Sequence, residues 1–298
     1  MSAGGDEAAA DGAARTNSGP PPGHASAASA GEAAELARRS LVLDSRGPDP
    51  FARGHLAGAG RISHDEFRGR RAELPPRTAH VLVVDDDLAE ARRAATTLAL
   101  LGYRHVRWLE APLAALPGGH DDDGPPARLW RPSPFLARML PRLPHGRALD
   151  LAAGSGRDAV HLALHGWRCE AWDHDPVALA RASALAASAG VTLETRVVEL
   201  EGGSPPGEHG PWDVIVVVRF LHRPLLPWIE RSLAPGGALV YETFRTGQER
   251  YGRPKNPRFL FAPGELRTAF PALHVEHYEE DDPEGGPVLA RLLARRRD

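Results

Sequence analysis

Strand-like and helix-like hydrophobic patterns alternate through residues 36–116. The apolar runs SLVLDSR (40–46), VLVV (81–84) and HVRWLE (105–110) have the length of strands. Between the last two, LAEARRAATTLALLG (88–102) places Ala and Leu at helical spacing and stops at a glycine. Strand–helix–strand order predicts a parallel sheet, so a small α/β domain is expected here.

A second, longer alternation fills residues 128–298. It begins with a buried strand ALDLA and a helix RDAVHLALH, and six further strand patterns follow. These predict a larger, doubly wound α/β domain. The later strands are expected at RCEAWD (168–173), TLETRVVELEGG (192–203), PWDVIVVVRFLHRP (211–224), SLAPGGALVYETF (232–244), ALHVEHYEED (272–281) and PVLARLLARR (287–296).

Two segments lack this periodicity. Residues 1–35 are rich in Ala, Gly, Ser and Pro and contain no aromatic residue. Such a composition buries too little apolar area to offset ordering entropy, so we expect a disordered tail. Residues 117–127, which include PGGHDDDGPP, have the composition of a linker. The chain is therefore expected to hold two domains, 36–116 and 128–298.

Charge and cysteine content narrow the function classes. The net charge of −3 gives no reason to expect a nucleic-acid or membrane surface. No apolar run approaches the length of a membrane span, and the N-terminus lacks the pattern of a secretory signal. Cys169 is the single cysteine, which excludes an internal disulfide and fits a cytoplasmic protein.

The first domain resembles the rhodanese-like family. LVLDSR, ARGHLAGAGRI (52–62), VLVVDDD and GYRHVRWLE follow one another in that family's order. The resemblance places the sulfur-carrying cysteine of active members at Asp85. An aspartate cannot accept a sulfane sulfur, and three adjacent carboxylates repel an anionic thiosulfate. The module is therefore predicted to be inactive as a sulfurtransferase and to serve docking, with a protein partner, or stability.

Two interpretations remain for the Asp85–Asp87 loop itself. The favoured one is a solvated loop whose acids lie near a helix N-terminus. The alternative is a cation site, which would need ligands from elsewhere in the chain. Cys169 lies in a strand-like pattern of the other domain, so we interpret it as a buried core residue rather than a reactive thiol.

A glycine turn is the main candidate for chemistry in the second domain. In GRALDLAAGSGRDAVHLALHGWRCEAWDHDP (146–176), glycines lie between a strand and a helix, and Asp173 ends the next strand. Glycines allow close approach to a ligand, and an acid there can accept hydrogen bonds from a ribose diol. G-S-G-R-D-A matches a dinucleotide pattern and allows NAD. Asp150, however, would repel a pyrophosphate, and it suits the ammonium and sulfonium groups of S-adenosylmethionine.

Residues 128–298 resemble the class I S-adenosylmethionine-dependent methyltransferases. Asp150 to Gly156 match the first motif of that class, with Ala152 where its first glycine is usual. AWDHDP and the short loop after the fourth strand resemble the tellurite-resistance methyltransferases. The resemblance implies S-adenosyl-L-methionine as cofactor. It also implies these cofactor-binding residues: Asp150, Ala152, Gly154, Gly156, Arg157, Asp173, His174, Glu199, Leu200 and Arg219.

Methyl transfer requires mainly alignment of nucleophile, methyl group and leaving sulfur. A soft or anionic acceptor, such as a chalcogen oxyanion or a thiol, needs no general base, so a small-molecule acceptor of this kind is expected. The candidate catalytic residues are Arg219, His222 and Tyr241, and no metal is expected. The basic loop 245–261 is interpreted either as a lid over an anionic acceptor or as a solvated surface loop.

The sequence thus predicts a two-domain α/β protein: an inactive rhodanese-like domain followed by a Rossmann-like methyltransferase domain. Two rival functions remain. One is a non-catalytic S-adenosylmethionine-binding or regulatory protein. The other is an NAD-linked oxidoreductase, which Asp150 disfavours.

Overall fold

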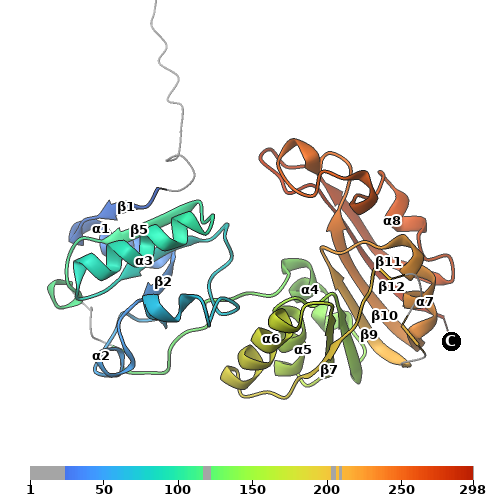
Figure 1. Cartoon of the computed structure of the whole chain (residues 1–298), viewed down its shortest axis with the longest axis horizontal. Helices are drawn as coiled ribbons and strands as arrows, with labels where there is room; N and C mark the ends of the chain where they lie inside the picture. The colour runs from blue at the N-terminus through green and yellow to red at the C-terminus, as the bar shows by residue number, and fades with distance from the viewer. Residues whose placement is uncertain (1–23, 117–121, 203–205, 208–209, 298) are drawn as a thin grey trace, which may run out of the picture. The chain divides into compact units, whose positions relative to one another are not determined.

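The computed structural model describes residues 24–116, 122–202, 206–207 and 210–297. The chain divides into two compact units (Figure 1). Unit 1 combines Met1–Arg61 with Arg77–Pro125, and unit 2 combines Ile62–Pro76 with Pro126–Asp298. No helix among the described residues is long and apolar enough to cross a membrane.

Unit 1 is built on a five-stranded sheet of order β1-β5-β4-β2-β3, in which every strand pair is parallel. This confirms the small parallel α/β domain predicted from the sequence. Its strands are β1 (Ser26–Ala28), β2 (Leu41–Asp44), β3 (Gly60–Arg61), β4 (His80–Val84) and β5 (His105–Leu109), and its helices are α1 (Ala30–Arg39), α2 (Pro48–Ala52) and α3 (Leu88–Leu100).

The expected disorder of residues 1–35 is wrong for residues 24–35, whereas residues 1–23 lie outside the described part. Strand β1 pairs with β5, and its Ala28 is fully buried. The Glu32 carboxylate accepts the Ser29 N–H at 2.9 Å and so caps the start of α1. Alanine is small enough to be buried completely, and strand pairing adds backbone hydrogen bonds that a composition argument does not count.

The expected linker, 117–127, is described only from Asp122 onward. Asp122 forms an isolated antiparallel bridge with His55, whose N–H donates to the Asp122 carbonyl at 2.8 Å. Asp122, the first described residue of this segment, is therefore hydrogen-bonded to unit 1.

Unit 2 is built on a seven-stranded sheet of order β11-β12-β10-β9-β6-β7-β8. Strands β6 to β10 pair in parallel, and β12 lies antiparallel between β10 and β11. The last strand of the chain is thus an inner strand. The strands are β6 (Arg147–Leu151), β7 (Arg168–Asp173), β8 (Glu194–Val197), β9 (Trp212–Val218), β10 (Leu233–Phe244), β11 (Leu273–Asp281) and β12 (Leu289–Arg296).

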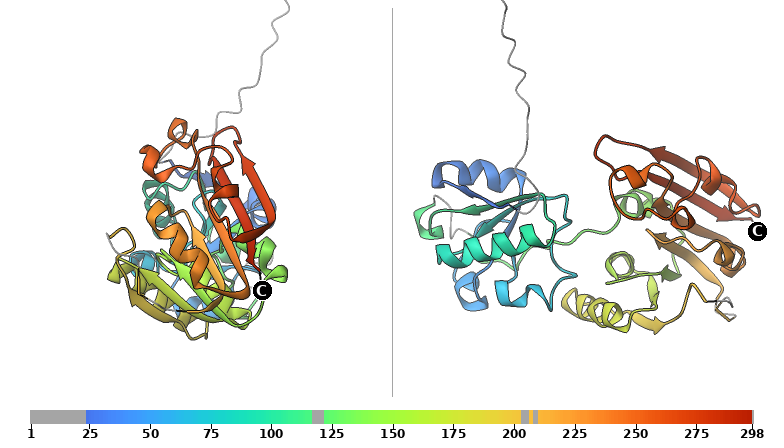
Figure 2. Two further views of the ribbon diagram at one scale, coloured as in Figure 1. Left: turned by 90° about the vertical axis from the view of Figure 1, so that its right-hand side faces the viewer. Right: turned by 45° about the horizontal axis from the view of Figure 1, so that its top comes forward.

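Helices cover both faces of this sheet (Figures 1 and 2). One core lies under α4 (Pro134–Met139), α5 (Arg157–Leu164) and α6 (Pro176–Ser188). The other lies under α7 (Leu226–Ser232) and α8 (Glu265–Thr268). This confirms the doubly wound architecture expected for the second domain.

Local sequence signals explain where the helices of unit 2 begin and end. Helix α6 starts with Pro176 at its first position, and the Asp175 side chain accepts the Val177 N–H at 2.8 Å. Gly166 follows α5 with a φ of 95°, a left-handed conformation that ends the helix.

Residues 62–76 belong to unit 2, although they lie within the range expected for the first domain. They contain a short 3₁₀ helix, His64–Phe67, which the Ser63 and Glu66 side chains cap reciprocally. Ile62, Phe67 and Leu74 are all buried. The first domain is therefore interrupted, and Ala72 of this segment packs with Val160, Leu185 and Ala186 of unit 2.

Candidate functional site

The glycine turn after β6 has a backbone that few side chains tolerate. Ala152, Gly154 and Gly156 have φ values of 59°, 54° and 72°, all in the left-handed region. A Cβ on Gly156 would lie 2.5 Å from the Ala182 Cβ, so this glycine lets α5 pack closely on α6. A Cβ on Gly154 would meet nothing within 4 Å. The turn is therefore closed on the helix side and open at Gly154, where a ligand can approach.

Two backbone outliers mark one edge of the sheet. Among the described residues, Ala152 and Arg219 are the non-glycine residues with positive φ. They directly follow β6 and β9, which are neighbouring parallel strands. The Arg219 N–H donates to the Glu242 carbonyl at 2.7 Å, which holds this turn against β10. Strained residues cluster at functional sites, so this edge is the candidate site.

Asp150 and Asp173 hold the glycine turn from two strands. The buried Asp150 carboxylate accepts the Ala159 N–H at 3.0 Å and so caps α5 from below. Burial, and then the neighbouring Asp158 carboxylate, raise the pKa of Asp150 well above its usual range. Asp173 accepts the Gly154 N–H at 2.8 Å and the Asp175 N–H at 2.9 Å. Both acids therefore lie where the sequence places them, and each also organises backbone.

Sequence reasoning missed a polar network beside this turn. Asp158 accepts the Ser133 N–H at 2.7 Å, and the Ser133 hydroxyl donates to Glu242 at 3.3 Å. Arg291 donates to the other Glu242 oxygen at 2.6 Å. Burial, together with repulsion from Glu242, raises the pKa of Asp158 to about 6. Asp158 stands in the quoted glycine motif, but only the fold brings Ser133 and Arg291 to it.

The carboxylates beside the glycine turn determine which cofactor suits this site. Besides burial, repulsion from Asp158 raises the pKa of Asp150, and repulsion from Glu242 raises that of Asp158, so an anion bound here would meet further carboxylates. A pyrophosphate would add to that repulsion, whereas an ammonium and a sulfonium would relieve it. With open space at Gly154 and an acid at the end of β7, these residues fit S-adenosylmethionine.

Three further cofactor candidates lie along the same edge. The exposed His174 ring lies 3.2 Å from Asp173, measured from Nδ1 to Oδ1. Leu200 is buried and Glu199 is exposed, and Glu199 accepts the Glu201 N–H at 3.0 Å. The third strand, β8, ends at Val197, so Glu199 and Leu200 stand just beyond it.

The expectation that Arg157 contacts the cofactor is not supported by its geometry. Its guanidinium donates to the carbonyls of Ala72 and Leu74, each at 2.8 Å. These hydrogen bonds direct Nε and Nη2 of the guanidinium to residues 62–76, where backbone carbonyls supply the acceptors.

Tyr241 is a correction to the catalytic candidates. Its side chain is fully buried in the core under α7 and α8, and its hydroxyl donates to the Phe220 carbonyl at 3.0 Å. Burial raises the pKa of this phenol. Tyr241 therefore supports the Arg219–His222 turn and does not face a substrate. His222 is half-buried and precedes the 3₁₀ helix Arg223–Leu225, while Arg219 is exposed at the site.

A pocket of about 670 Å³ lies over the ends of β9 and β10. Three cations line it, namely Arg219, Arg253 and Lys255, and none forms an ion pair with a described carboxylate. Two other arginines of the basic loop are paired: Arg245 lies 3.5 Å from Glu280, and Arg250 pairs with Asp282. The remaining lining residues are Glu201, Phe220, Leu221, Phe244, Pro254, Asn256 and Phe259.

The basic loop 245–261 is fastened at both ends. Arg245 and Phe261 form an isolated parallel bridge, and the Thr246 N–H donates to the Phe261 carbonyl at 2.8 Å. The buried Gln248 side chain accepts the Val288 N–H at 2.8 Å. In this structure the loop therefore forms a fixed wall of the pocket.

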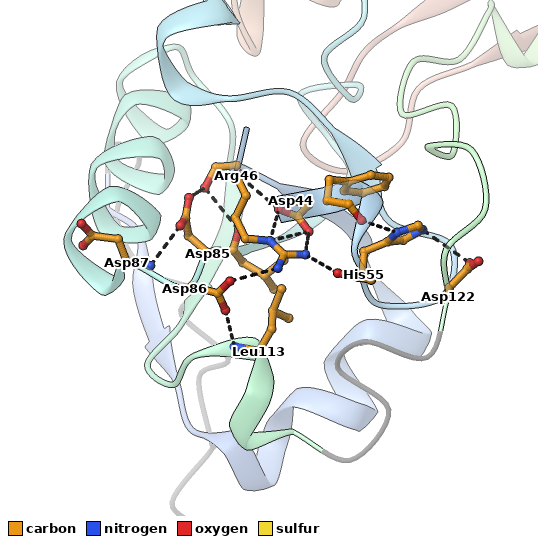
Figure 3. A network of polar contacts seen from close by, with 12 residues as sticks. Asp44, Arg46, His55, Asp85, Asp86, Asp87, Leu113 and Asp122 are labelled. Atoms are coloured by element: carbon orange, nitrogen blue, oxygen red, sulfur yellow. Dashed lines mark hydrogen bonds and ion pairs between the residues drawn. The ribbon is translucent and has the colours of Figure 1, made fainter. Parts of the chain in front are cut away.

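The aspartates of the rhodanese-like loop are held by protein donors (Figure 3). Asp85 accepts the Ser45 hydroxyl at 2.7 Å and the Asp87 N–H at 3.0 Å. Asp86 accepts from the Arg46 guanidinium at 3.0 Å and from the Leu113 N–H at 3.1 Å. Burial raises the pKa of Asp85. The expected solvated loop is therefore wrong for Asp85, which is buried.

Asp87 and Asp44 complete that arrangement. Asp87 caps α3, as it accepts the Ala89 N–H at 2.8 Å, which agrees with the expected helix N-terminus. Arg46 is buried and donates to Asp44 at 2.8 Å as well as to Asp86. The carboxylates of Asp44, Asp85, Asp86 and Asp87 therefore all accept hydrogen bonds from donors of the same domain. Within the described ranges, no group of three His, Cys, Asp or Glu residues could hold a metal ion.

The single thiol belongs to the other unit and is buried there. Cys169 lies on β7 of unit 2 and is buried, as expected from its sequence pattern. Its Sγ donates to the Trp167 carbonyl at 3.6 Å, and burial raises its pKa to about 12. A thiol with so high a pKa is a poor nucleophile.

Comparisons with known proteins assign both domains. Residues 29–113 match the family model of the rhodanese-like domain, and residues 148–237 match the family model described as a methyltransferase domain. The chain thus contains a match to a rhodanese-like domain followed by a match to a methyltransferase domain, in the order that the sequence resemblances implied.

Individual relatives are distant. An uncharacterized protein of Schizosaccharomyces pombe, UNK4.09, is 24% identical over 284 residues, 75% of this chain and 82% of that protein. The ribosomal protein L11 methyltransferase of Chelativorans sp. is 34% identical over 127 residues, 39% of this chain and 42% of that enzyme. TehB from Haemophilus influenzae has 21% identity and a TM-score of 0.46, covering 54% of this chain and 61% of TehB.

Proposed function

We propose that this chain transfers the methyl group of S-adenosylmethionine to a small acceptor that is an anion or a soft nucleophile, of the thiol or chalcogen-oxyanion type. The observation that carries the acceptor class is the trio of cations that line the pocket, Arg219, Arg253 and Lys255. Three cations around one pocket attract an anionic group. A thiolate or an oxyanion already carries the electrons that attack a methyl group, so it needs no general base.

The roles of the cofactor residues follow from their contacts. The open backbone at Gly154 approaches the cofactor, and Asp173 accepts from its ribose hydroxyls. Above about pH 6 the ionised Asp158 supplies the negative charge that suits its ammonium and sulfonium groups, whereas burial favours the neutral form of Asp150. When bound, S-adenosylmethionine supplies a methyl group already activated by the sulfonium.

The acceptor residues act by positioning. Arg219 stands at the edge shared with the cofactor site, and Arg253 and Lys255 stand on the basic loop. Together they would hold an anionic acceptor at the end of β9, in line with the methyl group. His222, half-buried in the same turn, is a further candidate contact with the acceptor.

The pocket favours an organic acceptor over an inorganic one. Its volume of about 670 Å³ lies within the range of sites for organic ligands. Phe220, Phe244 and Phe259 give it apolar walls. A tellurite-sized anion would leave these walls uncovered. An organic thiolate or carboxylate with an apolar body fits both the cations and the walls.

For the rhodanese-like domain we propose a non-catalytic role. The position of the family's catalytic cysteine holds Asp85, whose carboxylate is bound to Ser45 and Asp87. Arg46 and Leu113 hold the next residue. The Asp87, Ala89 and Glu90 N–H groups of this loop donate to its own aspartates rather than to a sulfur group. We therefore assign docking of a protein partner or support of the other domain as its function.

Calorimetric titration with S-adenosylhomocysteine and with NADH tests the cofactor. Wild type is expected to bind S-adenosylhomocysteine in the micromolar range, and Asp173→Ala to weaken that binding at least tenfold. Asp175→Ala is the matched control, because Asp175 caps α6 and keeps its N–H bond to Asp173. Binding of NADH instead would establish the oxidoreductase alternative.

Turnover then tests the acceptor. Production of S-adenosylhomocysteine is measured with aryl and alkyl thiols, organic carboxylates, selenite and tellurite. We expect Arg253→Ala and Lys255→Ala to raise KM for the best acceptor without changing cofactor affinity. Cofactor binding with no turnover on any of these acceptors would favour the non-catalytic, regulatory alternative.

A further inference from the structure

Residues 62–76 stand in an unusual place for a part of the rhodanese-like match. They lie within the matched range, 29–113, yet they belong to the compact unit that contains the methyltransferase domain. The neighbours of this segment are the two helices that follow the glycine turn and β7, namely α5 and α6. The segment is therefore a candidate for influencing the cofactor site.

Hydrogen bonds fasten the segment to the first residue of α5. Arg157 donates through Nε to the Ala72 carbonyl and through Nη2 to the Leu74 carbonyl, each at 2.8 Å. Nη2 also reaches the Arg71 carbonyl at 3.4 Å. Bonds from a charged donor to several carbonyls are stronger than neutral ones, and their planar fork fixes direction.

An apolar contact adds to these bonds. Ala72, which is 4% exposed, packs in one cluster with Val160 of α5 and with Leu185 and Ala186 of α6. Trp130 completes the cluster. The segment therefore covers the apolar seam between the two helices that Gly156 allows to approach each other.

The same first turn of α5 carries the cofactor site. Gly156 precedes Arg157, and Asp158 follows it. Asp150 accepts from the third residue of the helix, Ala159. Movement of Arg157 therefore moves the turn that presents Gly154 and the carboxylates.

The ends of the segment continue into the sheet of unit 1. The chain leaves β3 at Arg61, whose strand pairs with β2, and it enters β4 at His80. The Arg77 carbonyl accepts the Arg104 N–H at 3.4 Å. Through the chain itself, the order of residues 62–76 depends on the folding of the rhodanese-like domain.

We propose that residues 62–76 are a brace through which the rhodanese-like domain controls cofactor affinity, with Arg157 as the positioning residue. The brace keeps the first turn of α5 in its binding geometry. Because linkage is reciprocal, cofactor binding also orders the brace. A partner or modification that loosens the rhodanese-like domain therefore weakens cofactor binding. The proposal rests on the proposed S-adenosylmethionine site.

The test uses the full-length chain and the affinity for S-adenosylhomocysteine. Arg157→Ala and Ala72→Glu are expected to weaken binding about tenfold, within the usual range of coupling between sites. Arg157→Lys keeps the charge but loses the fork, so it should lie between wild type and Arg157→Ala. Arg68→Ala is the control, because Arg68 is exposed in the same segment. Near-ultraviolet circular dichroism verifies that each variant is folded.

Hydrogen exchange on wild type gives a readout that needs no variant. Saturating S-adenosylhomocysteine should slow amide exchange in residues 62–76 as well as in the first turn of α5. Equal affinity of wild type and the folded variants, or unchanged exchange in residues 62–76, would overturn the brace alone. If wild type fails to bind S-adenosylhomocysteine, the proposed cofactor is wrong, and the brace falls with it.

Discussion

Ala152 and Arg219 share a left-handed backbone, with φ values of 59° and 58°, directly after two neighbouring parallel strands. Neither residue is a glycine, so both positions are strained. The strain lies at the edge where the glycine turn and the pocket meet. Ala152 and Arg219 keep this left-handed conformation because the surrounding hydrogen bonds impose it.

Replacing Ala152 by glycine should stabilise the protein. The left-handed conformation costs alanine about 1–2 kcal/mol, and the greater entropy of glycine in the unfolded chain offsets about 0.4–1 kcal/mol of this. We expect a net gain of up to about 1.6 kcal/mol in the free energy of unfolding, measured by urea denaturation. Ala153→Gly is the control, because Ala153 has no positive φ and should only lose stability. Equal losses for both variants would show that Ala152 is not strained.

The two glycines of the turn should separate stability from binding. Gly156→Ala places a Cβ 2.5 Å from that of Ala182 at a φ of 72°, so we expect a loss of about 2–4 kcal/mol in stability. Gly154→Ala places its Cβ in open space, so its main effect should be weaker binding of S-adenosylhomocysteine. Thermal denaturation and calorimetry on both variants distinguish these effects. A Gly154→Ala variant with wild-type affinity would place the cofactor elsewhere.

Asp158 should make the stability of the protein depend on pH. Its pKa in the folded protein, about 6, exceeds the ordinary value of an aspartate. Ionisation of Asp158 therefore lowers the free energy of unfolding progressively between about pH 4 and 6, and above about pH 6 this loss stays constant. Asp158→Asn should therefore be more stable than wild type by about 1–3 kcal/mol at pH 7 and equal to it near pH 4.

The same carboxylate attracts the sulfonium only when it is ionised. The ratio of S-adenosylmethionine affinity to S-adenosylhomocysteine affinity should rise as pH increases through about 6 in wild type and should stay flatter in Asp158→Asn. Calorimetry from pH 5 to 8 measures this ratio. Parallel pH profiles for the two proteins would remove Asp158 from the cofactor's charge environment.

Restoring a cysteine should not restore a sulfurtransferase. In Asp85→Cys the Ser45 hydroxyl and the Asp87 N–H lose their acceptor, which should cost about 1–3 kcal/mol of stability. Asp86 stays bound to Arg46 and Leu113, so the loop keeps its present shape. Thiocyanate formation from thiosulfate and cyanide should remain at the wild-type background. Clear turnover by the variant would contradict the inactive-loop interpretation.

Short-range signals explain how much of the architecture was predictable. Period-two apolar runs and the caps at Asp87 and Asp175 mark strands and helices locally, because each depends on a few adjacent side chains. Asp150, Gly154, Gly156 and Asp173 could be predicted to lie together, since parallel strands present their carboxyl ends at the same edge. The rhodanese-like and methyltransferase assignments followed from these motifs.

Other features depend on contacts between distant residues. The position of β12 inside the sheet, the burial of Tyr241 and the pairing of Ser133 with Glu242 all join segments far apart in the chain. Composition misjudged residues 24–35, because pairing of β1 with β5 cannot be read from alanine content. The sequence by itself specified the elements and the glycine turn. Only tertiary packing decided that Arg157 binds residues 62–76, because carbonyl partners are not encoded in side-chain type.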